Sequence, residues 1–133
     1  MLLPHGTVIA LIDGAKFELF RNTGTEAEPE LTAQDTPHLE TQNQSAGQSE
    51  EKGSHSGHHK GETVHAAAAV DWLNRQVLAR KLDNLVVIAA PRTLGEMRPL
   101  YHKQLEGVLL GELAKDLAGR NSPEILSALR EHG

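Results

Sequence analysis

The segment TVIALIDGAKFELFR, residues 7–21, decides the fold of this chain. It opens with an unbroken apolar run over residues 7–12, which is typical of a strand covered on both faces. Residues 15–21 then alternate apolar and charged side chains, as in a strand with one covered face. Asp13 and Gly14 stand between the two runs, and this pair favours a tight primed turn because glycine tolerates positive φ. The segment therefore predicts an antiparallel hairpin.

A crossover to a parallel strand is predicted after the hairpin. A short strand is expected at residues 29–33. An amphipathic helix is expected from Thr63 to Leu82, with Thr63 as its cap and Lys81 in its last turn, where a cation suits the helix dipole. The apolar run at residues 85–90 predicts another strand, and this strand–helix–strand order implies a right-handed parallel crossover.

The last third of the chain supplies two more helices and a strand. Thr93 and Glu96 match a capping box, which predicts a helix from there to about Gln104. A strand is predicted at residues 107–113, and Ser122 is expected to cap a final helix. Together these elements predict an α/β (mixed α+β) fold, in which helices pack on a mixed sheet with the hairpin at one side.

Composition excludes several classes of protein. The 133 residues suit one domain spanning 1–133, and the absence of cysteine excludes disulfides, zinc thiolate sites and thiol catalysis. No apolar run is long enough for a membrane span and no secretory signal is visible, so we expect a cytoplasmic protein without a membrane partner. The net charge of −5 argues against broad attraction to nucleic acid, and DNA is not expected as a partner. The charge is uneven, because residues 1–62 carry −6 and residues 63–133 carry +1.

A polar stretch over residues 35–62 interrupts the pattern of strands and helices. It is rich in Gly, Ser, Gln, His and Glu, and Leu39 is its one large aliphatic residue. Such a segment buries too little apolar surface to offset its ordering entropy, so we expect a mobile loop.

Two segments of the chain share a pattern with a known family. They are IDGAKFELF, residues 12–20, and VIAAPRTLGEMR, residues 87–98, and the tail from Glu112 to Leu117 fits as well. In these segments the chain resembles the bacterial host attachment protein family, and Pro-Arg-x-Leu-Gly is the most specific part. That family is thought to be distantly related to the middle domain of archaeal and eukaryotic peptide-chain release factors. The resemblance implies an RNase-H-like mixed five-stranded sheet and action on the ribosome or transfer RNA.

The polar loop holds one alternative, catalytic site. Release factors carry a Gly-Gly-Gln tip in the matching loop, and this chain has Ala46, Gly47 and Gln48 there. The resemblance implies that Gln48 would lie beside the ester carbonyl of peptidyl-tRNA. Ala46 restricts the backbone freedom that the first glycine supplies, and a chance match in a Gln-rich loop is the simpler interpretation.

The same loop holds an alternative metal site. His55, His58 and His59 have a spacing that suits Zn²⁺ or Ni²⁺. A Gly/Ser-rich loop lacks the fixed geometry that a metal site needs, so adventitious affinity is the simpler interpretation and no cofactor is expected. These histidines would also titrate near neutral pH and change the charge of the loop.

Arg92, Thr93 and Arg98 are the candidate ligand-binding residues. Arg92 follows a parallel strand and precedes a helix, a place where anions are favoured. A phosphate of RNA or of a nucleotide is the functional interpretation, and a salt bridge from Arg92 to Glu96 or Asp71 is the structural alternative.

The sequence shows no catalytic constellation. Asp13 invites comparison with RNase-H-like nucleases, but the strand at residues 85–90 offers no carboxylate for two-metal chemistry, and a turn role is expected instead. We therefore expect a non-enzymatic module that binds RNA, the ribosome or a translation-associated partner and affects attachment to host cells indirectly. Peptidyl-tRNA ester hydrolysis and metal- or pH-responsive regulation are the alternatives.

Overall fold

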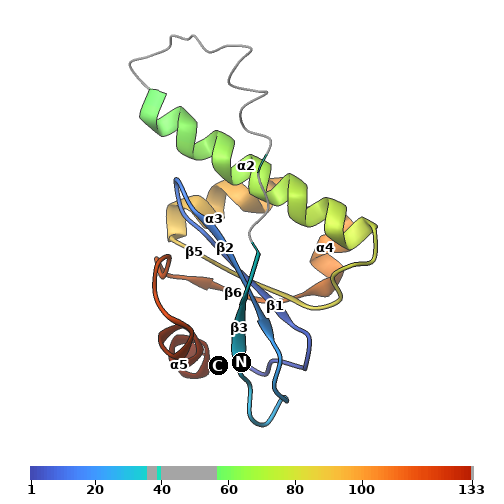
Figure 1. Cartoon of the computed structure of the whole chain (residues 1–133). Coiled ribbons are helices and arrows are strands. Elements are labelled where there is room, and N and C mark those ends of the chain that lie inside the picture. Colours follow the sequence, from blue (N-terminus) through green and yellow to red (C-terminus); the bar gives the residue numbers. More distant parts are fainter. Residues whose placement is uncertain (36–38, 40–56, 133) are drawn as a thin grey trace.

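The computed structural model describes residues 1–35, 39 and 57–132, and these form a mixed sheet between two layers of helices (Figure 1). The sheet has five strands in the order β3-β2-β1-β5-β6: β1 (Val8–Ile12), β2 (Phe17–Asn22), β3 (Leu31–Gln34), β5 (Leu85–Ala89) and β6 (Leu109–Ala114). The helical segments are α2 (Gly57–Leu78), α3 (Pro91–Met97), the short 3-10 helix η2 (Arg98–Leu100), α4 (Lys103–Val108) and α5 (Ser122–His132). The predicted α/β fold with a mixed five-stranded sheet is confirmed.

Strand β1 is the centre of the sheet. It pairs antiparallel with β2 and parallel with β5. Strand β2 pairs antiparallel with β3, and β6 pairs parallel with β5. Every residue of β1 and β5 is buried, because helices cover both faces of these two strands. The predicted hairpin and the predicted parallel crossover are both confirmed.

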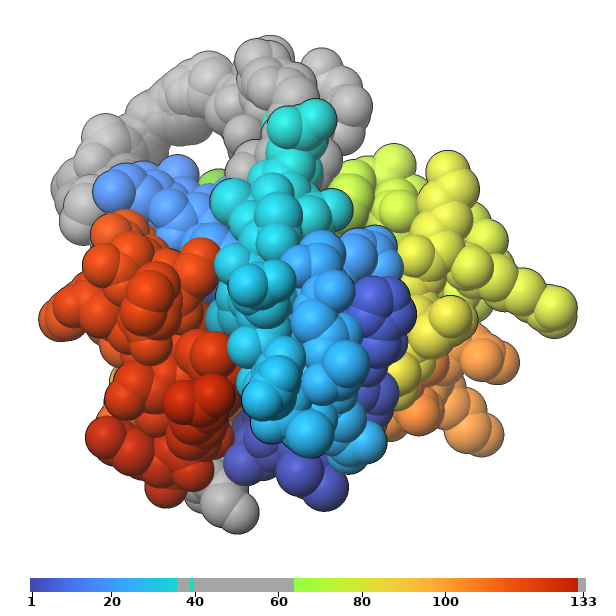
Figure 2. Space-filling model, turned by 60° about the horizontal axis from the view of Figure 1, so that its bottom comes forward, coloured from blue at the N-terminus to red at the C-terminus, as the bar shows by residue number. Residues whose placement is uncertain are grey.

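Each face of the sheet has its own apolar core. On one face, alternate β1 residues such as Ala10 pack against Val70 and Leu73 of α2, and α3 and α4 add Leu94, Met97 and Leu105. On the other face, Ile9 and Leu11 pack against α5, which lies beside the edge strand β3 (Figure 2). Ala10 alternates with Ile9 and Leu11 along β1 because successive side chains of a strand point to opposite faces of the sheet.

Trp72 of α2 covers the end of the hairpin. Its ring meets that of Phe17 edge to face, with the centroids 5.6 Å apart and the planes at 74°. Trp72 therefore packs against the core cluster on the α2 face of the sheet.

The hairpin turn differs from the predicted primed turn. Gly14 is not among the described glycines with positive φ, which are Gly6 and Gly119. Instead the Asp13 carboxylate accepts hydrogen bonds from the amides of Ala15, at 2.7 Å, and Lys16. The loop is therefore held by the Asp13 side chain, which confirms its turn role.

Helix α2 begins and ends earlier than predicted. It begins at Gly57, so Thr63 is not its cap, and residues 57–62 are helical although a loop was predicted there. Once a helix is nucleated each added residue gains a hydrogen bond, and no proline stands in this stretch to stop it. It ends at Leu78 because Arg80 adopts a left-handed φ of 60°. Lys81 therefore lies beyond the helix and not in its last turn.

The segment after β5 forms several short helices, where one helix from Thr93 to about Gln104 was predicted. Helix α3 begins at Pro91, which occupies the first helical position, and Ala90 precedes it without a side-chain cap. Thr93 is consequently inside the helix, and the predicted capping box with Glu96 is wrong. The predicted helix to Gln104 is interrupted, because Pro99 lacks an N–H and Tyr101 is extended.

The final strand begins slightly later than predicted, and the cap of the final helix lies one residue earlier than predicted. Gly107 and Val108 belong to α4, and β6 begins at Leu109. Asn121, and not Ser122, caps α5: its Oδ1 accepts from the Glu124 amide at 3.0 Å, and Glu124 Oε1 accepts from the Asn121 amide at 3.3 Å. This reciprocal pair is a capping box. Among the described residues, no helix is both long and apolar enough to cross a membrane.

Candidate functional site

The carboxyl ends of β5 and β6 lie at a point where the chain leaves the sheet in opposite directions. After β5 the chain enters α3, on the face covered by α2, whereas after β6 it continues to α5 on the other face (Figure 1). In α/β sheets, ligands favour the carboxyl ends of parallel strands, where such connections begin.

Five residues beside these strand ends form what we call the β5–β6 corner: Arg92, Thr93, Arg98, Tyr101 and Glu112. Arg92 and Thr93 lie in the first turn of α3, directly after β5, with Arg92 exposed and Thr93 half-buried. Arg98 follows the last residue of α3, and Tyr101 ends the 3-10 turn. The structure therefore brings all three predicted ligand-binding residues to one helical segment at this corner.

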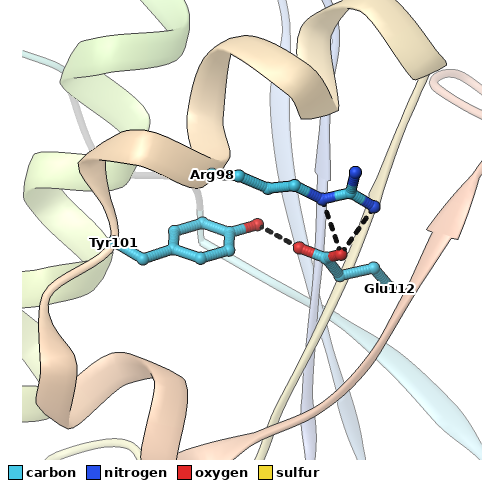
Figure 3. Close-up of polar contacts among 3 residues, drawn as sticks. All are labelled: Arg98, Tyr101 and Glu112. Carbon is cyan, nitrogen blue, oxygen red and sulfur yellow. Dashed lines mark hydrogen bonds and ion pairs between the residues drawn. The ribbon is translucent and has the colours of Figure 1, made fainter.

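The Glu112 carboxylate joins Arg98 to Tyr101 (Figure 3). Nε of Arg98 donates to Oε1 of Glu112 at 2.9 Å, and Nη2 lies 2.8 Å from the same oxygen. The Tyr101 hydroxyl donates to Oε2 at 2.8 Å. Both oxygens of the carboxylate are thus engaged, and the carboxylate fixes the position of the arginine.

A β-bulge gives Glu112 its orientation. Leu85 pairs with Leu109 and Val86 with Gly111, so Leu110 is an extra residue in β6. The extra residue reverses the alternation that follows it. Leu109 therefore packs against the α2-side core, Leu113 packs against the opposite core, and Glu112 lies on the α2 side, where Arg98 is.

Burial and hydrogen bonding change the acid–base behaviour of this group. Burial of the Tyr101 hydroxyl, reinforced by its hydrogen bond to Glu112, raises the pKa of Tyr101 far above its usual value. The hydrogen bond and charge of Glu112 raise the pKa of Arg98 as well. Both groups therefore keep their protons under all ordinary conditions, Tyr101 as a neutral donor and Arg98 as a cation.

Sequence reasoning found the arginines of this corner but missed Glu112 and Tyr101. The available signal was a single acid inside the otherwise apolar segment LLGELA, which becomes β6. An acid in such a strand usually needs a partner, but the sequence does not say which cation is near. The alternative partner suggested for Arg92, Asp71, forms an ion pair with Arg75 at 3.1 Å.

A known protein family matches nearly the whole chain. A model of the bacterial archaeo-eukaryotic release factor family 12 matches residues 6–129. The chain belongs to this family. No curated protein matches its sequence. The predicted relation to release factors is therefore confirmed at the level of the family.

Most residues of the two alternative sites predicted in the polar loop lie outside the described part of the chain. These are Gly47, Gln48 and His55; His58 and His59 fall in the first turn of α2, where the backbone alone is described. Among the described residues no three His, Asp or Glu side chains converge as metal ligands. The Ala-Gly-Gln site and the histidine site therefore stay predictions.

Proposed function

We propose that this chain is a non-enzymatic module that binds RNA of the translation machinery, in the ribosome or in transfer RNA, through the β5–β6 corner. Membership of a release factor family over residues 6–129 carries the proposal, since it points to translation. The corner supports it, because two arginines stand beside the carboxyl ends of parallel strands, where α/β folds bind ligands.

The test compares two arginines by co-sedimentation with purified ribosomes over a range of KCl concentrations. Arg92→Ala should weaken binding about 5- to 30-fold and lower the slope of log affinity against log salt by about 1, because one phosphate contact is lost. Arg75→Ala is the matched control: it also removes an exposed arginine, but from α2, where Arg75 pairs with Asp71. Absence of sedimentation of the wild type at low salt would overturn the proposal.

Peptidyl-tRNA hydrolysis is the second candidate, and the family match favours it. In this case Gln48 would position water beside the ester carbonyl, with Gly47 allowing the backbone to approach. Gln48→Ala should then abolish release of the peptide from peptidyl-tRNA by the purified protein, and release at the wild-type rate would eliminate the candidate.

We also propose that any effect on attachment to host cells, suggested by the resemblance to host attachment proteins, is indirect and arises in the cytoplasm. Cell fractionation with an antibody to the chain tests this localisation. Recovery in the outer-membrane or culture-medium fraction would contradict it.

A further inference from the structure

We infer that Arg92, Gly95 and Arg98 form a seat for an RNA phosphate, in which the missing side chain of Gly95 lets the RNA backbone approach α3 between two guanidinium groups. The inference rests on the proposed function and deepens it. It assigns a role to Gly95, which has no side chain that could itself bind an anion.

The three residues are neighbours on the surface of α3 and of the start of η2, because Arg98 directly follows α3 and keeps helical backbone angles. Arg92 and Gly95 are three residues apart, and so are Gly95 and Arg98, and residues with this spacing are adjacent on a helix. All three are exposed. Gly95 is therefore flanked by one arginine on either side.

Gly95 has no structural reason to be glycine. A Cβ atom added there would meet no atom of the described residues within 4 Å, and the φ of Gly95 is not positive. The contrast with Gly24 is clear, since a Cβ at that position would lie 2.4 Å from the carbonyl oxygen of Glu28. Glycine also disfavours a helix relative to nearly every other residue, so packing and propensity both argue against it at position 95. Close approach of another molecule is the physical role that remains.

Arg98 is already oriented for this role. Its side chain runs back along α3 toward the first turn of the helix, and one terminal nitrogen points away from Glu112 (Figure 3). The long side chain of a helical residue covers the turn that precedes it, which in α3 is the turn of Gly95. Because Glu112, which is itself held by the Tyr101 hydroxyl, binds the guanidinium, little conformational entropy would be lost when a phosphate binds its outward N–H groups.

The experiment uses a matched pair of glycines. Gly95→Gln fills the seat, whereas Gly107→Gln places the same side chain on α4, at another exposed helical glycine with open space around it. Figure 1 shows α3 and α4 under different parts of α2. Both variants should unfold at the same urea concentration as the wild type or at a higher one, as followed by fluorescence of Trp72, the one tryptophan of the chain.

Binding to purified ribosomes at low KCl then separates the two positions. Gly95→Gln should weaken binding roughly tenfold or more, and Gly107→Gln should bind within about twofold of the wild type. If Arg92→Ala binds weakly but Gly95→Gln binds as the wild type does, the proposed function stands and the seat is overturned. Equal weakening by both glutamines would also overturn the seat, because the effect would not depend on position. A wild type that does not bind would instead remove the proposed function itself.

Glu112→Ala tests whether Arg98 must be held in place, because the two explanations predict opposite changes in the affinity for RNA. Removing an acid should strengthen binding to RNA if net charge alone governs affinity. If Glu112 is a positioning residue, affinity should fall by several-fold although the protein becomes less acidic. Tighter binding of this variant would overturn the claim that Arg98 must be held in place.

Discussion

At the scale of a single residue, the ionisation of the Tyr101 hydroxyl is a probe of the β5–β6 corner. It is the one tyrosine of the chain, so its ionisation is visible in ultraviolet absorbance without interference. Burial and the hydrogen bond to Glu112 raise the pKa of Tyr101 in the folded protein, whereas the unfolded value is about 10. The neutral phenol therefore contributes stability that is fully present below pH about 10 and is lost as the pH rises above it.

We expect the tyrosinate absorbance of the native protein to stay absent through pH about 10, and to develop with a midpoint near 10 once the chain is unfolded in concentrated urea. The urea midpoint should fall as the pH rises above 10. Tyr101→Phe should abolish the absorbance step and the part of the stability loss that comes from this phenol. A native midpoint near 10 would show that the hydroxyl is neither buried nor bonded to Glu112.

At the scale of an element, the end of α2 shows how backbone geometry stops a helix. Arg80 has φ of 60°, its amide donates to Val77 O at 2.9 Å, and the Lys81 amide donates to Gln76 O at 2.9 Å. This pair of bonds is the Schellman motif, in which glycine is usual at the left-handed position. Arginine is strained there because its Cβ crowds the following carbonyl.

Arg80→Gly should therefore stabilise the protein by about 0.5–1 kcal/mol, as measured by urea denaturation. Lys81→Gly is the matched control, because this residue is equally exposed but does not have a positive φ. It should leave stability unchanged or lower it. An equal gain from both glycines would mean that strain at position 80 is not the cause.

At the scale of the whole molecule, Asn22 connects the N-terminal arm to the loop between β2 and β3. It is fully buried at the end of β2. Its Nδ2 donates to Leu3 O at 2.7 Å and to Thr25 O at 3.2 Å, and its Oδ1 accepts from the amides of Gly24 at 2.8 Å and Glu30 at 2.9 Å. One amide side chain thus holds the N-terminal arm and both ends of the loop between β2 and β3.

Asn22→Ala should cost on the order of 2–4 kcal/mol, because several buried backbone groups lose their partner together. The free energy of unfolding in urea measures it. Gln34→Ala on the neighbouring strand is the control: within the described part of the chain its side chain bonds to carbonyls of its own strand, and the change should stay within about 0.5 kcal/mol. A small cost at Asn22 would indicate that water replaces the lost bonds.

Much of the architecture could be predicted from local patterns. The runs at residues 7–12 and 85–90 are apolar without a break, so burial on both faces followed directly from composition. The hairpin followed from the alternation around Asp13, and the crossover followed from the order of elements. Element ends were predicted less well, since near Thr93 and near Ser122 more than one residue could begin a helix, and local propensity does not choose between them.

The amino-acid sequence by itself determined the α/β class, the two central strands, and the presence of arginines after a parallel strand, because these depend on periodicity and nearest neighbours. Only the tertiary structure decided that Glu112 binds both Arg98 and Tyr101, and that a Cβ at Gly95 would meet none of the described residues within 4 Å. Glu112 reaches this face through the bulge at Leu110, and a one-residue change of register reverses every later side chain in a strand. Pairing between strands sets such a register, and a single chain segment read in isolation does not contain it.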